Sequence, residues 1–67
     1  MLQIMSTRER EILQLVANEL TTKEIADTLF LSTHTIDTHK KNIKLKLDVR
    51  NVAGMIRRGF EIGILTT

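Results

Sequence analysis

The chain has 67 residues, which suits one small domain and leaves no room for a separate catalytic domain. It contains no cysteine, so a disulfide framework and a thiolate metal site are both excluded. The apolar runs are far shorter than the roughly 20 residues of a membrane-spanning helix, and the first residues lack the pattern of a signal peptide. Two phenylalanines are the only aromatic residues, which argues against a stacking platform for RNA or single-stranded DNA.

Positive charge is concentrated in one part of the chain. The net charge is +2, but residues 33–50 carry five basic and two acidic side chains, a local net charge of +3. A basic stretch of this kind is typical of a surface that binds phosphates, although it can also serve solubility alone.

The first predicted helix runs from Thr7 to Asn18. Ser6 and Glu9 have the spacing of a capping box, in which a hydroxyl and a carboxylate satisfy free backbone N–H groups at a helix start. Apolar residues follow at helical spacing. We therefore expect this helix to be part of the scaffold.

Thr21 and Glu24 repeat the capping box and predict a second helix from Thr22 to Leu29. Ser32 is a suitable N-cap for a third helix over residues 33–47. About three residues remain between these helices, which is the turn length of a helix-turn-helix, here without the usual glycine. Residues 21–47 therefore predict a helix-turn-helix.

The third predicted helix has two different sides. At about 100° per residue, Ile36, Ile43 and Leu47 fall within about 20° of one another and form the expected buried stripe. An α-helix fits the major groove of DNA, where each base pair shows its own donors and acceptors, so a polar opposite side could read sequence. An ordinary solvated face is the alternative. The outward residues are His34, Asp37, Thr38, Lys41 and Leu45, and the first four are the predicted base contacts.

The fourth predicted helix begins after Asn51 and ends near Gly63. Its apolar residues spread over an arc of about 200°, roughly twice the width that one core contact requires. We therefore predict that part of this helix pairs with its own copy in a two-fold dimer. The alternative is that the extra width covers Leu2, Ile4 and Met5. The predicted dimer interface consists of Val52, Met55, Ile56, Gly59 and Phe60.

The pattern from about residue 5 to residue 65 resembles the DNA-binding domain of LuxR-type regulators, also called the FixJ and NarL group. The resemblance implies an all-α fold, a compact four-helix domain whose third helix enters the major groove and whose fourth helix often forms the dimer contact. It also implies DNA sites made of inverted half-sites. The matching residues are Arg8, Glu9, Glu11, Ile12, Leu13, Lys23, Glu24, Ile25, Ala26, Leu29, Leu31, Ser32, Thr35, Ile36, His39, Asn42, Ile43, Lys46 and Leu47.

The resemblance also implies roles for single residues. Base contacts in the family come from positions that match Asp37, Thr38 and Lys41. His39 matches an almost fixed histidine, which we expect to be mainly structural, with a DNA backbone contact as the alternative. Lys23 could equally be a free surface lysine. The predicted phosphate contacts are Lys23, Thr33, Thr35, Asn42, Lys44 and Lys46, and all but Lys44 match positions that contact phosphate in the family.

Three features depart from the family pattern. Glu19 replaces the glycine that usually closes the first helix, so we expect the left-handed conformation to shift to Asn18. Asp37 replaces a residue that is often basic or neutral. Its carboxylate would be repelled by phosphates but can accept a hydrogen bond from a cytosine amino group, so we hypothesise that it narrows specificity at a cost in affinity. Val52 and Met55 replace a more usual arginine and alanine.

The leading interpretation is the sequence-specific DNA-binding domain of a bacterial transcription regulator, acting in the cytoplasm without cofactor or metal. The expected partners are double-stranded DNA, a second copy of the chain, and, by resemblance, an N-terminal receiver or sensor domain and RNA polymerase. The alternative is a helical protein-interaction module, but such a module would place apolar anchors where this chain has only Leu45. An enzyme is disfavoured, because His34 and His39 lack the four-residue spacing of two metal ligands on a helix.

Overall fold

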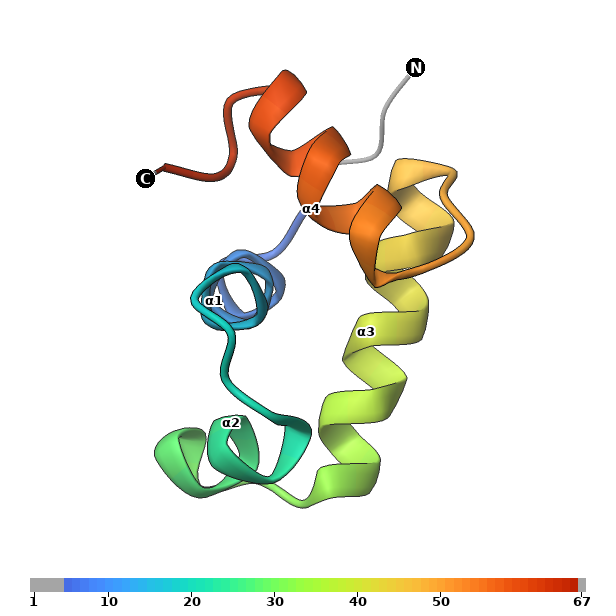
Figure 1. Ribbon diagram of the computed structural model, residues 1–67. Helices are drawn as coiled ribbons and strands as arrows, with labels where there is room; N and C mark the ends of the chain where they lie inside the picture. Colours follow the sequence, from blue (N-terminus) through green and yellow to red (C-terminus); the bar gives the residue numbers. More distant parts are fainter. Residues whose placement is uncertain (1–4, 67) are drawn as a thin grey trace.

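The computed structural model describes residues 5–66, which form four helices and no strand. Figure 1 shows α2 beside the start of α3, α4 beside the end of α3, and α1 beside its middle. The all-α prediction is confirmed, and α1 ends one residue earlier than predicted because Asn18 is its C-cap. None of the described helices is long and apolar enough to cross a membrane. The helices are α1 Thr7–Ala17, α2 Thr22–Leu29, α3 Thr33–Leu47 and α4 Val52–Glu61.

The predicted start signals are formed as hydrogen bonds. In α1 the Ser6 N–H donates to Glu9 Oε1 at 2.8 Å, and the Glu9 N–H donates to Ser6 Oγ at 3.1 Å. Thr21 and Glu24 make the same pair of bonds, at 2.8 and 3.1 Å, at the start of α2. Each capping box satisfies backbone groups that the helix leaves free, so the helix starts follow from local sequence.

Each of the four helices is followed within two residues by a residue in the left-handed conformation, and only one of these four residues is a glycine. Positive φ angles occur at Glu19, Phe30, Asp48 and Gly63. After α1, the Leu20 N–H returns to the Leu15 carbonyl at 3.1 Å and the Glu19 N–H to the Val16 carbonyl at 3.0 Å, which is a Schellman motif. In a Schellman motif the left-handed residue is the one after the C-cap, which here is Glu19. The predicted shift to Asn18 is therefore wrong: Asn18 has a φ of −83°, and Glu19 has a φ of 68°.

The core lies where α1, α2 and α4 all pack against α3. The six largest fully buried side chains share this one interior, and Met5 joins them from the segment before α1. Ile36, Ile43 and Leu47 are buried as the helical period predicts. The fully buried side chains are Ile12, Leu13, Ile25, Ile36, Ile43 and Met55.

Two residues of the predicted dimer interface belong to this core. Met55 has no exposed surface. Gly59 is also buried, and a Cβ atom there would lie 2.7 Å from Leu65 Cδ1, so the glycine makes room for the chain segment after α4. Met55 and Gly59 are therefore not available to a second copy, because the monomer itself uses their surface. Of the N-terminal residues proposed as an alternative cover, Met5 is buried, and Leu2 and Ile4 lie outside the described residues.

An ion pair joins α1 to α3. Lys46 Nζ lies 2.7 Å from Glu9 Oε1, and only 6% of the Glu9 side chain is exposed. The Glu9 carboxylate therefore serves two helices, since it caps α1 and accepts a hydrogen bond from α3. Burial by itself raises the pKa of the Glu9 carboxyl, but the hydrogen bonds from Lys46 and Ser6 and the lysine charge outweigh burial and hold the pKa below its ordinary value.

We expect the domain to lose stability as the pH falls below about 4.5, the ordinary pKa of Glu9. A carboxyl whose pKa is lower in the folded than in the unfolded state stabilises the fold above the unfolded pKa. This contribution disappears as the pH falls through the folded pKa. Urea unfolding at neutral pH and at about pH 3 measures the loss.

The matched control for this prediction is Glu9→Gln, which keeps the size of the side chain and removes its charge. Its free energy of unfolding at neutral pH should fall by about 1–3 kcal/mol, because Lys46 loses a charged partner. Its acid sensitivity should be smaller but not absent, since hydrogen bonds from Thr21 also lower the pKa of Glu24. The same pH dependence in both proteins would contradict the role of Glu9.

Candidate nucleic-acid interface

The start of α3 is built by hydrogen bonds within its first turn. Ser32 Oγ accepts a hydrogen bond from the Thr35 N–H at 3.0 Å, and the two hydroxyl oxygens lie 2.8 Å apart. Thr35 is half-buried. These bonds set where α3 begins.

The helix turns its predicted base-contacting side chains away from the core. Ile36 and Ile43 on the opposite side are fully buried. Thr38 Oγ1 donates to the His34 carbonyl at 3.1 Å, which leaves the oxygen lone pairs and the methyl group of Thr38 for an outside contact. Leu45 also faces outward and is 70% exposed. All four predicted base contacts are exposed: His34, Asp37, Thr38 and Lys41.

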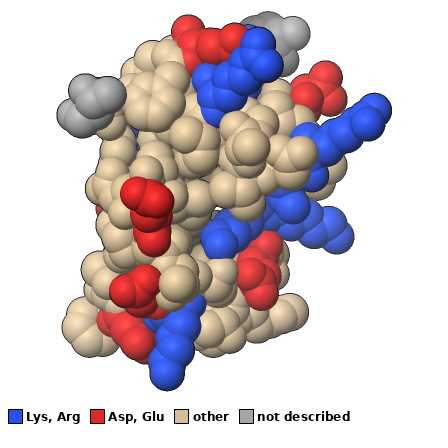
Figure 2. All heavy atoms as spheres, in the orientation of Figure 1, with Lys and Arg blue, Asp and Glu red and all other residues tan. Residues whose placement is uncertain are grey.

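The predicted phosphate contacts divide into two groups. Lys23, Thr33 and Asn42 are exposed, whereas Thr35, Lys44 and Lys46 are half-buried. Figure 2 shows basic side chains projecting from the side of the molecule that α3 forms. Positive charge on that side is suited to the phosphates that flank a major groove.

Lys46 differs from the other predicted phosphate contacts because it is engaged within the domain. Its Nζ is bound to Glu9 at 2.7 Å, and 26% of its side chain is exposed. In this structure it joins α3 to α1. The sequence offered one signal for this role, since Lys46 lies three residues after Ile43 and so borders the buried stripe of the helix.

Sequence reasoning missed a second lysine of this kind. Lys40 is half-buried, and its Nζ donates to Thr22 Oγ1 on α2 at 2.6 Å. Its position four residues after Ile36 puts it on the inner side of the helical wheel, and this spacing was the available signal. His39 beside it is also half-buried.

Part of the exposed surface of α4 is apolar, beside the charged Arg57 and Glu61. Val52 and Phe60 are 44% and 42% exposed, and Ile56 between them is half-buried. These three residues follow one another at four-residue intervals and so lie along one stripe of the helix. We call Val52, Ile56 and Phe60 the α4 stripe.

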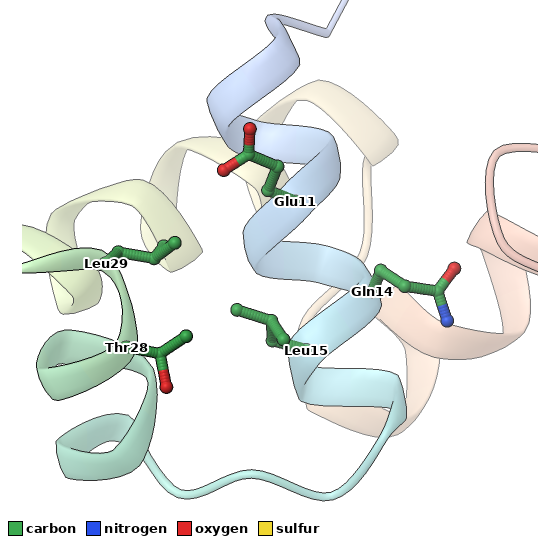
Figure 3. A pocket seen from close by; sticks show the side chains of 5 residues that line it. All are labelled: Glu11, Gln14, Leu15, Thr28 and Leu29. Carbon is green, nitrogen blue, oxygen red and sulfur yellow. The ribbon is translucent and has the colours of Figure 1, made fainter.

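A shallow groove lies between α1 and α2 (Figure 3). Leu15 and Leu29 extend toward one another across it. The Thr28 hydroxyl is already used, since it donates to the Glu24 carbonyl at 2.7 Å. The groove was not predicted from the sequence, and it offers apolar surface rather than a catalytic arrangement. Its lining residues are Glu11, Gln14, Leu15, Thr28 and Leu29.

Within residues 5–66, no group of three or more His, Asp or Glu side chains is placed to hold a metal ion. The candidate functional features of the described chain are the outward side of α3, the lysine at the start of α2 and the α4 stripe. The first two stand on the two helices of the helix-turn-helix.

Known proteins with similar sequences are bacterial regulators. Residues 3–58 match the family model GerE, described as bacterial regulatory proteins of the luxR family. The response regulatory protein YgeK of Escherichia coli K12 is 45% identical over 62 residues, which cover 92% of this chain and 42% of YgeK. The transcriptional regulatory protein MctR of Rhizobium johnstonii is 42% identical over 62 residues, covering 92% of this chain and 29% of MctR. The chain thus spans less than half the length of these relatives.

Solved structures with the same fold include a domain of nearly equal length. The transcription factor GerE superimposes with a TM-score of 0.91 at 33% identity, covering 96% of each chain. The response regulator ChrA of a heme-sensing two-component system gives a TM-score of 0.89 at 35% identity, covering 92% of this chain and 31% of ChrA. The chain therefore belongs to the LuxR family of bacterial regulatory proteins and is a DNA-binding helix-turn-helix domain of that family.

Proposed function

We propose that this domain recognises a specific double-stranded DNA sequence by placing α3 in the major groove. The observation that carries the proposal is the division of α3 into two sides, with fully buried isoleucines inward and exposed polar residues outward. His34, Asp37, Thr38 and Lys41 offer hydrogen-bond donors and acceptors within about two helical turns, the reach of one half-site.

Phosphate contacts would hold α3 in this groove. Lys23 at the start of α2 and Asn42 and Lys44 on α3 are the residues we assign to this task, together with Thr33 and Thr35. Lys46 remains a predicted phosphate contact, and its bond to Glu9 also fixes α3 on α1.

A two-fold dimer would allow two copies to read inverted half-sites. The α4 stripe supports this assembly, because it leaves Val52 and Phe60 exposed at one end of the molecule, away from the start of α3. An apolar stripe that buries itself against its own copy is a self-complementary interface.

The domain would act within a longer regulator in the bacterial cytoplasm. YgeK and ChrA are both named response regulators, and this chain covers less than half of each. A preceding receiver or sensor domain would control the DNA-binding domain, and RNA polymerase would respond to it. The regulatory role requires no catalytic residue in the described chain.

Selection of bound duplexes from a random DNA library tests the central proposal. We expect an inverted repeat to be enriched and to bind more tightly than a scrambled duplex by a factor on the order of 1,000. The logarithm of the affinity should fall with the logarithm of salt concentration, with a slope of about −0.9 per neutralised phosphate. No enrichment, even when a fused partner enforces dimerisation, would mean that the fold serves protein contacts instead.

Replacing Asp37 with alanine should raise the affinity for DNA in general and lower the discrimination between sequences. We expect Asp37→Ala to bind the scrambled duplex more tightly, because a negative charge near the phosphates is removed. Discrimination at one base pair of the half-site should fall by about 1–3 kcal/mol, because the acceptor for a cytosine amino group is lost. Competition titrations against single-base variants of the selected site measure both effects. An unchanged base preference would refute the role of Asp37.

Charged substitutions in the α4 stripe should disrupt the dimer. The double variant Val52→Glu and Phe60→Glu should remain monomeric in analytical ultracentrifugation at high micromolar concentration, where we expect the unsubstituted protein to dimerise. Its affinity for the inverted repeat should fall on the order of 100-fold, since the two half-sites are no longer bound together. Affinity for a single half-site should change much less.

Phe30→Asn is the matched control for the dimer prediction. Phe30 is 93% exposed in the turn between α2 and α3, at the far end of the molecule from α4. Asparagine tolerates the left-handed conformation of this position. The control should dimerise like the unsubstituted protein. A monomeric unsubstituted protein at these concentrations would overturn the proposed dimer.

A further inference from the structure

The helix that we propose to enter the major groove, α3, carries a lysine that points inward. Lys40 is half-buried, and its ammonium nitrogen lies 2.6 Å from the hydroxyl oxygen of Thr22, the first residue of α2. The two residues are 18 positions apart in the chain. Lys40 therefore joins the middle of α3 directly to the start of α2.

The chemistry of this contact favours a geometric role over a stabilising one. Thr22 is a neutral acceptor, and within residues 5–66 Lys40 forms no ion pair with a carboxylate. A single hydrogen bond contributes only about 0.5–1.5 kcal/mol of net stability. An apolar side chain of similar length could fill the same space, but it would not join one defined atom of α3 to one defined atom of α2.

The helix that Lys40 holds is short, and its apolar contacts with the core lie in its middle and at its end. α2 has eight residues, and Ile25 and Ala26 are its only buried ones. Short helices depend on tertiary contacts for their position as well as for their stability. A bond at the first residue of α2 restrains the end of the helix that lies farthest from its left-handed C-cap at Phe30.

Both ends of the contact adjoin residues assigned to DNA. Thr22 directly precedes Lys23, which we assign to a phosphate, and Lys40 directly precedes Lys41, which we assign to a base. The bond between Thr22 and Lys40 therefore restrains the position of the phosphate contact relative to the base contact.

We propose that Lys40 is a positioning residue for sequence reading, an inference that rests on the proposed DNA-binding function. Through Thr22 it keeps α2 and α3 in the arrangement in which Lys23 meets a phosphate while Lys41 meets a base. The selected DNA sequence requires both contacts at once, whereas other sequences are held by phosphate contacts alone. Lys40 thereby contributes to discrimination without touching DNA.

The test uses Lys40→Met and Thr22→Val, which remove either partner of the bond, and the double variant. Each protein is titrated with the selected duplex and with a scrambled duplex at several salt concentrations. Each single substitution should lower the ratio of the two affinities about fivefold, the size expected for one lost hydrogen bond. The double variant should lower it no further, because the two residues act through one contact. The salt slope should not change, since no phosphate contact is removed.

Lys44→Met is the matched control, because Lys44 is a lysine of the same helix that we assign to a phosphate. It should weaken binding to both duplexes equally and reduce the salt slope by about 0.9. Circular dichroism melting of every variant gives the folded fraction by which each affinity is corrected.

Three outcomes would overturn the positioning role. Lys40→Met could behave like Lys44→Met, which would make Lys40 itself a phosphate contact. The affinity ratio could stay unchanged in both single variants, or the losses of the two single variants could add in the double variant. Failure of the unsubstituted protein to distinguish the two duplexes is a different result, since it would refute sequence-specific binding and this inference with it.

Discussion

Burial of one side of α3 is the constraint on which the rest of this structure depends. α1, α2 and α4 all pack against α3, so the inward positions of that helix are shared by every other element. Ile36 and Ile43 have no exposed surface. A domain of 67 residues has only one core, and rotation of α3 about its axis would expose this apolar surface to water. The orientation of the outward side is therefore set by the energetics of the inward side.

Some lysines of α3 bind other helices of the domain, and others are exposed to solvent. The number of lysines in α3 is therefore larger than the number available for contacts with DNA. Lys40 and Lys46 are bound to α2 and α1, whereas Lys41 is exposed. Lys40 and Lys46 connect α3 to two different helices at positions six residues apart. In the proposed function, rigid support of this kind would keep the side chains assigned to base contacts in register, since a binding surface is only as well positioned as the residues behind it.

The helix ends show how tertiary demands outweigh local preference. Glu19, Phe30 and Asp48 adopt left-handed conformations that favour glycine, each at a cost of roughly 1–2 kcal/mol. The returning hydrogen bonds and the burial that follows each turn offset this cost. Asparagine tolerates the left-handed conformation better than glutamate, but the Schellman motif after α1 places that conformation at the residue after the C-cap, Glu19. The position of the left-handed residue therefore follows from the direction that the chain takes after α1.

The sequence by itself determined the helices, their starts and the two sides of α3. These features depend on residues three or four positions apart: Ser6 with Glu9, Thr21 with Glu24, and the repeat that begins at Ile36. Only the tertiary structure decided which partners the inward polar and small residues meet. The bond from Lys46 to Glu9 spans 37 residues, and the closeness of Gly59 to Leu65 depends on how the chain folds back after α4. A helical period gives an angle around one helix, but contact between side chains also depends on the distance to the neighbouring helix, which only packing sets.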